Sequence, residues 1–197
     1  MKLILPALLF PLLVASCGSI LQPVEDTSVH HLLDPVVPVR KITGTSPSVA
    51  IASPALPSYL DRSQLVSRTG TGELQMNTFH LWGESLDSGI SRVTALNLGR
   101  LKNSLNIQPV RNFVTLDYQT LLELRISRFE PDPFGRIVLD ATWKLQPVEG
   151  PVARTRAFTT IVPILGPPLS PTDPQTGRIA AMNEALARLA REIACAL

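Results

Sequence analysis

Two stretches in the second half of the chain alternate between apolar and polar residues. The apolar positions are Leu122, Leu124 and Ile126 in the first stretch, and Ile137, Leu139, Ala141, Trp143 and Leu145 in the second. Successive side chains of a β-strand point to opposite faces, so this period predicts two strands that each bury one face. The short connection at 131–135, Pro-Asp-Pro-Phe-Gly, predicts that the two strands pair antiparallel.

Shorter apolar runs predict additional strands, most of them bounded by proline or glycine. These strands are residues 29–33, 48–52, a hairpin of 64–69 with 73–79 around Gly70-Thr71-Gly72, and 153–162. Residues 56–62 are expected to form a single helical turn. Residues 163–174 contain five prolines, a composition that is typical of a loop or an extended docking arm.

A spacing of three and four residues between apolar positions marks two helices. The first is expected to begin near Glu84 or Ser85 and to end from Asn103 onward, with Trp82, Leu86, Ile90, Val93, Leu101 and Leu105 on one face. The second is expected at about 175–196, with Ile179, Met182, Leu186, Leu189, Ile193 and Leu197 on one face. Such stripes usually pack on a sheet. The predicted fold class is therefore α+β, a mainly antiparallel sheet covered by two amphipathic helices, in a single domain over residues 29–197.

The first sixteen residues have the character of an export signal. Lys2 is the one charge in this segment, and residues 3–14 are almost all aliphatic. About a dozen apolar residues are too few to cross a bilayer, which needs roughly 20. Pro6 and Pro11 also interrupt the run, and interior prolines break helices. Residues 1–16 are therefore predicted to be a signal peptide that is cleaved between Ser16 and Cys17.

The end of this leader, Val14-Ala15-Ser16-Cys17, resembles the bacterial lipobox. That resemblance implies that Cys17 is diacylated with fatty chains such as palmitate, becomes the new N-terminus and is N-acylated. Two or three acyl chains hold a protein on a membrane far more firmly than one. The alternative is a plain signal peptide in which the cysteine stands by chance.

Residues 17–28 are then the acylated N-terminus and a tether. They are small, polar and interrupted by proline, and ten extended residues reach at most about 35 Å. By resemblance to enteric lipoproteins, Gly18 in place of an aspartate points to the outer membrane, facing the periplasm.

Composition gives no support to some classes of partner. The formal net charge is +2 with 17% charged residues and no run of Lys or Arg, so nucleic acid and anionic lipid surfaces gain no support from charge. If Cys17 is acylated, Cys195 has no partner within the chain, because the sequence has two cysteines. Cys195 is expected to be a small buried hydrophobe.

Candidate chemistry is sparse. The histidines are His30, His31 and His80, and the adjacent pair points to opposite faces of a strand, so it does not serve one metal or one nucleophile. No nucleophile elbow, phosphate-binding loop or zinc motif is present. We therefore expect no enzymatic activity, no cofactor and no metal. Three aromatic residues are candidates for a ligand groove, although a core position is favoured for each: Tyr59, Trp82 and Trp143.

Several segments together resemble one known family. They are Pro57-Ser58-Tyr59-Leu60-Asp61-Arg62 followed by Gln64-Leu65-Val66, then Trp82-Gly83-Glu84-Ser85-Leu86, Arg128-Phe129-Glu130, and the strand 135–145 with Ala141-Thr142-Trp143. With the lipobox, they resemble the ABC-type transport auxiliary lipoproteins, the family of paraquat-inducible protein C. The first strand departs from the expected pattern, because His30-His31 stands where aromatic or aliphatic residues are expected.

The resemblance implies a non-enzymatic envelope component. Such lipoproteins work with membrane-anchored MCE-domain proteins that move lipids between the inner and outer membranes, and this one would do so as a single copy or as a homo-oligomeric ring. Tyr59, Asp61 and Arg62 belong to the most specific segment and are the candidate partner surface. Two alternatives stay open, a lipid-binding carrier and a structural or cell-wall-associated lipoprotein.

Overall fold

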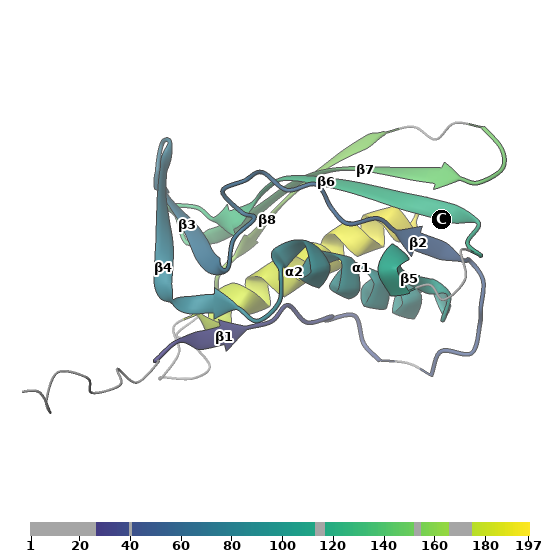
Figure 1. Ribbon diagram of the computed structural model, residues 1–197, viewed down its shortest axis with the longest axis horizontal. Coiled ribbons are helices and arrows are strands. Elements are labelled where there is room, and N and C mark those ends of the chain that lie inside the picture. Colours follow the sequence, from purple (N-terminus) through teal and green to yellow (C-terminus); the bar gives the residue numbers. More distant parts are fainter. Residues whose placement is uncertain (1–26, 40, 113–116, 152–154, 166–174) are drawn as a thin grey trace, which may run out of the picture.

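The computed structural model describes residues 27–39, 41–112, 117–151, 155–165 and 175–197 (Figure 1). Its strands are β1 (Val29–His31), β2 (Val49–Ile51), β3 (Gln64–Gly70), β4 (Glu73–Trp82), β5 (Ile107–Pro109), β6 (Thr120–Pro131), β7 (Arg136–Pro147) and β8 (Arg156–Pro163). Its helices are α1 (Leu86–Lys102) and α2 (Thr176–Ala194), with a 3-10 turn, η1 (Val110–Asn112). The predicted signal peptide and most of the predicted tether and proline-rich arm lie outside the described residues.

The strands form two mixed sheets. The larger has the order β5-β2-β6-β7-β8, in which β2 runs parallel to both of its neighbours while β6, β7 and β8 are antiparallel. The smaller has the order β1-β4-β3, with β1 parallel to β4. The fold class is thus α+β with two helices, as predicted, but the sheets are mixed rather than mainly antiparallel. The short strands β1 and β2 pair with strands that come much later in the chain. Long connections of this kind permit parallel pairing, which the local sequence pattern does not reveal.

The hairpin of β6 and β7 is the longest paired unit and confirms the antiparallel pairing expected from the alternating pattern. Leu122 faces Leu145, and Leu124 faces Trp143. At the turn, the Asp132 side chain accepts hydrogen bonds from the backbone N–H groups of Phe134 and Arg136, at 2.9 and 3.0 Å. Gly135 adopts a φ of 70°, where glycine carries no Cβ penalty. The turn sequence therefore fixes the register of the pair.

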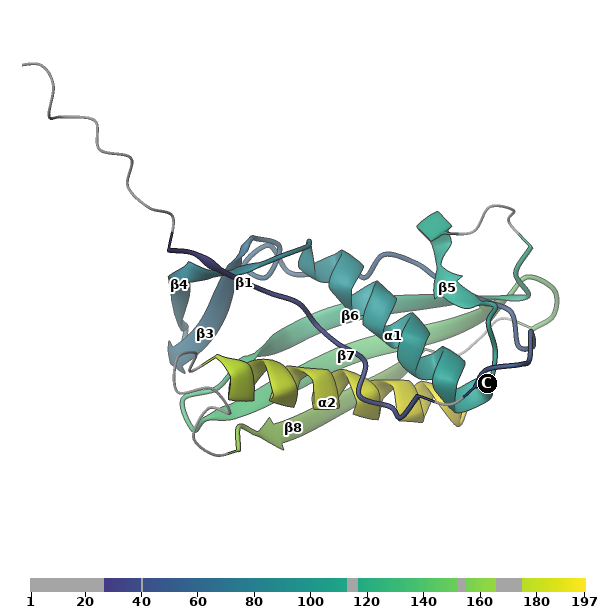
Figure 2. The ribbon, with the colours of Figure 1, turned by 90° about the horizontal axis from the view of Figure 1, so that it is seen from below.

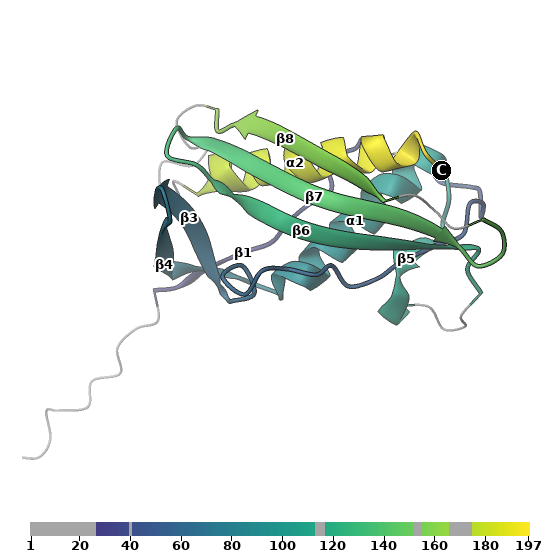
Figure 3. The same cartoon turned by 90° about the horizontal axis from the view of Figure 1, so that it is seen from above.

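Both helices lie on the same face of the larger sheet, as Figures 2 and 3 show from opposite sides. The core sits between them and the sheet, with Ile90 of α1, Leu186 of α2 and Leu139 of β7 all fully buried. The small sheet lies at one end of the molecule, beside the start of α2, and the C-terminus lies at the other (Figures 1 and 2).

The predicted apolar stripes are buried to different extents. In α2, each of Ile179, Met182, Leu186, Leu189 and Ile193 is buried. In α1, Leu101 is 37% exposed and Leu105, beyond the helix, is 54% exposed, while Leu98 is fully buried. The helix ends because Asn103 takes a left-handed conformation with φ of 53° and its backbone N–H bonds to the carbonyl of Gly99.

Three local expectations are revised. Residues 56–62 form a hydrogen-bonded turn, with Leu60 N–H to the Pro57 carbonyl at 2.9 Å, and not a helix. The segment after α1 contains β5 and η1, which the sequence pattern did not predict. Cys195 is exposed rather than buried, because it follows the last turn of α2.

Candidate functional site

The residues expected to carry the lipid, Ser16 and Cys17, lie outside the described residues. Thr27, the first described residue, stands two residues before β1. Because β1 pairs with β4 in the small sheet, the described chain enters the fold at the end of the molecule formed by β1, β3 and β4 (Figure 2).

Tyr59, the first of the three candidate partner residues, is partly buried against the core. Its hydroxyl donates a hydrogen bond to Glu130 Oε2 at 2.9 Å. Burial, together with the adjacent Glu130 carboxylate, raises the pKa of Tyr59 to about 12. The side chain is therefore neutral at physiological pH and ties the turn at 57–61 to β6.

Glu130 is the centre of this arrangement. Its side chain is fully buried, and its Oε1 lies 3.0 Å from Arg68 Nε and 3.2 Å from Arg128 Nε. Its Oε2 also accepts the backbone N–H of Phe129 at 2.9 Å. We call Tyr59, Arg68, Arg128 and Glu130 the Glu130 cluster. Hydrogen bonding to Glu130 raises the pKa of Arg68, so the guanidinium stays charged. The cluster joins β3, β6 and the 57–61 turn.

Asp61 and Arg62 occupy the surface beside this cluster. Asp61 is exposed, and Arg62 is half-buried. Arg62 Nη1 donates to Met76 Sδ at 2.8 Å, a weak acceptor for a cation. Tyr59 thus has a structural role within the predicted trio. None of the ion pairs found among the described residues includes Asp61 or Arg62.

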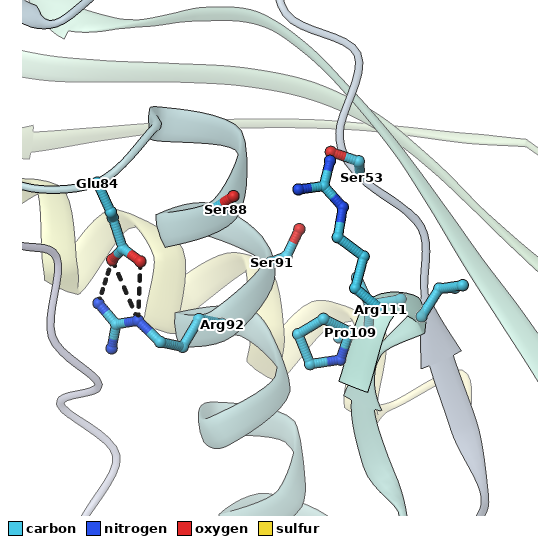
Figure 4. A pocket seen from close by; sticks show the side chains of 9 residues that line it. Ser53, Glu84, Ser88, Ser91, Arg92, Pro109 and Arg111 are labelled. Carbon is cyan, nitrogen blue, oxygen red and sulfur yellow. Dashed lines mark hydrogen bonds and ion pairs between the residues drawn. The ribbon is translucent and has the colours of Figure 1, made fainter. Parts of the chain in front are cut away.

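The second motif segment, residues 82–86, positions the start of α1. Trp82 is buried in the core. Glu84 accepts a hydrogen bond from Arg92 Nε at 3.1 Å (Figure 4). Arg92 Nη2 also donates to the Leu33 carbonyl at 2.8 Å. These contacts hold the segment after β1 against the helix.

A cavity of about 190 Å³ lies beside this pair, between α1, β2 and η1. Ser53, Ser91 and Arg111 line it (Figure 4). Next to it, Ser53 Oγ donates to Asp87 Oδ2 at 2.5 Å. Burial opposes ionisation of Asp87, but hydrogen bonds from the side chains of Ser53 and Ser85 outweigh it and lower the pKa of that carboxyl. Among the described residues that line the cavity, none is a histidine or a cysteine.

The three histidines lie on β1 and β4 of the small sheet. His30 is exposed and His31 is buried, on opposite faces as predicted. His31 Nε2 lies 2.8 Å from His80 Nδ1, and the two rings stack at 5.1 Å. The sequence pattern does not predict this pair, because the contact between His31 and His80 depends on the parallel pairing of β1 with β4. Within the described ranges, no group of three or more His, Cys, Asp or Glu side chains is placed to hold a metal ion.

One further contact was not anticipated from the sequence. Glu130 and Arg68 were not singled out as partners, because they stand 62 residues apart and meet through the packing of β3 on β6.

None of the described helices is long and apolar enough to cross a membrane.

The comparisons with known proteins identify a family and a fold. Residues 31–194 match the family model described as ABC-type transport auxiliary lipoprotein component. No match was found among curated proteins.

Solved structures share the fold. One, an uncharacterised protein, has a TM-score of 0.64 at 16% identity, covering 79% of this chain and 94% of its own. Protein XCC0632 from Xanthomonas campestris, of family DUF330, has a TM-score of 0.61 at 20% identity, covering 84% and 92%. A PelC dodecamer from Paraburkholderia phytofirmans reaches a TM-score of 0.41 at 14% identity, covering 82% and 90%. This last similarity is too low to support a conclusion about assembly.

Proposed function

We propose a function for this chain on one premise, that it belongs to the family of ABC-type transport auxiliary lipoprotein components, whose model spans residues 31–194. The proposed function is a non-enzymatic accessory of an MCE-type intermembrane lipid transport system, anchored to the outer membrane and facing the periplasm. The observation that carries it is the combination of this family match with the aliphatic-small-small-cysteine sequence at 14–17.

The anchor in this proposal is Cys17, acylated after removal of residues 1–16. A tether over 17–28 then leads to β1. Because β1 pairs with β4, a pull on the tether is transmitted to the small sheet rather than to a free end. A lipid needs an apolar path across the aqueous periplasm, and a domain held in this way can fix the far end of such a path.

The proposed partner surface consists of Asp61, at the end of the 57–61 turn, and Arg62, which follows it. The Glu130 cluster supports this turn through Tyr59, whose hydroxyl lies 2.9 Å from Glu130. Charges at a rim affect recognition and association rate more than total affinity. We therefore assign these two residues to orientation of the MCE-domain partner and not to the bulk of the binding energy.

A lipid-binding carrier remains the second candidate. The observation in its favour is an open apolar groove of about 400 Å³ between α1 and β5, lined by Leu96, Leu105 and Ile107 among others. Native mass spectrometry of the protein extracted from envelopes separates the two candidates. Co-purified phospholipid that is lost in a Leu96→Asp variant would favour the carrier over the accessory role.

The anchor is tested by Cys17→Ser in the intact chain. We expect an unprocessed precursor without acyl groups and unchanged folding of the domain, measured by mass spectrometry of the N-terminus and by membrane fractionation. Unaltered processing and fractionation of the variant would refute the lipid anchor.

The partner surface is tested by charge reversal. Asp61→Lys combined with Arg62→Glu should reduce crosslinking of the acylated protein to an MCE-domain protein in intact cells. The matched control is Glu192→Lys, an exposed charge near the opposite end of α2. Equal crosslinking in wild type, control and double variant would exclude this surface, and no crosslink in any of them would exclude the accessory role.

A further inference from the structure

A second cavity, of about 320 Å³, lies between β3, β4 and the start of α2. Its polar lining residues are Ser67, Gln75, Asn77, Thr78, Gln175 and Arg178. These side chains supply hydroxyl, amide and guanidinium donors, and no carboxylate is among the described lining residues. The cavity therefore has a positive and donor-rich character.

Arg178 is the residue that distinguishes this cavity. It is 7% exposed, and its Nη1 donates to Gln175 Oε1 at 3.1 Å while its Nη2 donates to the Val66 carbonyl. Its Nε is buried with no hydrogen-bond partner among the described residues. None of the ion pairs found in these residues includes Arg178, which thus contrasts with the usual rule that buried charges are paired.

The backbone adds to this positive charge. Arg178 lies in the first turn of α2, a helix of 19 residues with no acidic residue in that turn and no side-chain cap. A helix N-terminus carries a partial positive charge and favours anions, so an arginine there increases an electrostatic potential that is already positive. Burial lowers the pKa of Arg178 to about 10, which leaves the guanidinium charged at neutral pH.

Asn77 of β4 lines the same cavity. Asn77 Oδ1 accepts the backbone N–H groups of Phe79 and His80, each at 3.1 Å. This fixes the carboxamide of Asn77, so that its Nδ2 is left to donate. Donors converging from three elements suit the several oxygens of a phosphate group better than the two of a carboxylate.

The rim of the cavity is apolar. Phe79 is 58% exposed and Met76 is 43% exposed, and both line the cavity. We propose that this cavity is a binding site for a phosphate group, held by Arg178 and the N-terminus of α2, with Phe79 and Met76 contacting the apolar part of an amphiphile. The proposal does not require the lipid anchor or the MCE-domain partner. The phosphate has two conceivable sources, a phospholipid headgroup and free inorganic phosphate.

Isothermal titration calorimetry of the full chain in a neutral detergent tests the proposal at constant ionic strength. The probes are inorganic phosphate, dihexanoylphosphatidylglycerol below its micellar concentration, and acetate. We expect saturable phosphate binding that Arg178→Gln weakens by about tenfold or more, since a hydrogen bond to a charged group contributes that much. The matched control is Arg188→Gln, which removes an arginine of the same helix that pairs with Glu184 at 3.1 Å outside the cavity.

The variants also keep the test decisive if Arg178→Gln does not fold. Ser67→Ala with Thr78→Val keeps the guanidinium and should still weaken phosphate binding several-fold. Tighter binding of the phospholipid than of inorganic phosphate, reversed by Phe79→Ser, identifies a headgroup site, and equal binding identifies a site for free phosphate.

Three results would overturn the proposal. They are no saturable binding of either phosphate probe, acetate binding as tight as phosphate binding, and phosphate binding that appears in Asp173→Asn but not in wild type. The last would mean that a carboxylate of the chain itself neutralises Arg178.

Discussion

Two of the buried charged side chains among the described residues, Glu130 and Arg178, differ in how their charge is neutralised. In the Glu130 cluster, a fully buried carboxylate is surrounded by Arg68, Arg128 and Tyr59, with contacts of 2.9 to 3.2 Å. At the start of α2, the guanidinium of Arg178 is almost as deeply buried and has a backbone carbonyl and an amide oxygen as its partners. The charge of Glu130 is neutralised by two arginines of the described residues. No ion pair found among these residues neutralises Arg178.

This difference separates a structural role from a binding role. A paired buried charge adds little net stability relative to an apolar replacement, but removing one partner is costly. An unpaired buried charge is costly as it stands, so its presence indicates a ligand that supplies the missing charge. The Glu130 cluster therefore fixes the 57–61 turn, whereas Arg178 is available to an anion.

The largest effect is expected from Glu130→Gln. It leaves Arg68 and Arg128 beside a neutral side chain, and breaking a buried pair in this way should lower the free energy of unfolding by about 3 kcal/mol. Urea denaturation measures this loss. Glu123→Gln is the control, because Glu123 is 52% exposed and lies 3.7 Å from Lys144, and it should cost less than about 1 kcal/mol. Similar losses in both variants would mean that the cluster is not a structural centre.

Tyr59→Phe tests the neutral member of the cluster. It removes one hydrogen bond to Glu130 and should cost about 1 kcal/mol at pH 7. The pKa of Tyr59 is raised in the folded state to about 12, so folded protein keeps a proton that unfolded protein loses between pH 10 and 12. The stability advantage of wild type over Tyr59→Phe is therefore full below pH 10 and declines toward pH 12. Urea titrations at pH 8, 10 and 11.5 would show it, and a constant difference would contradict this assignment.

Arg178→Gln should have a smaller effect on stability. It loses the hydrogen bond to the Val66 carbonyl but also removes a buried charge without a carboxylate partner, and the two changes oppose each other. We expect the free energy of unfolding to change by no more than about 1 kcal/mol in either direction. A loss as large as that of Glu130→Gln would show that Arg178 has a structural role comparable to the cluster.

The smallest effect is expected from Arg188→Gln. Arg188 and Glu184 form an i,i+4 pair whose side chains are 41% and 34% exposed, and exposed pairs of this kind contribute at most about 0.5 kcal/mol. Thermal denaturation of this variant sets the baseline against which the two buried sites are compared. If Arg188→Gln destabilised the protein more than Tyr59→Phe does, burial would not determine how much these side chains contribute to stability.

Local patterns predicted the parts of the fold that depend on neighbours in sequence. Apolar residues at every second position, such as Leu122 and Leu124 or Leu139 and Ala141, predicted β6 and β7, and the stripe through Leu186 predicted α2. They did not predict that β2 lies between β5 and β6. A strand of three residues carries too little pattern to specify partners, and its pairing is decided by packing of distant segments.

The candidate sites were less predictable than the fold. The motif at 57–62 drew attention to Tyr59, but the acceptor of its hydroxyl, Glu130, is 71 residues away. Arg178 stands off the apolar stripe of α2, so helix periodicity does not predict that it is buried. It is buried because the carbonyl of Val66 on β3 lies over it, a contact that helix periodicity does not reveal.

The exposure of Cys195 offers a practical way to measure orientation. The cysteine follows α2 at the pole of the molecule opposite β1 (Figure 2). If Cys17 is consumed by acylation, a maleimide fluorophore attaches at a single thiol, and energy transfer to a dye in the bilayer then reports the height of that pole above the lipid surface.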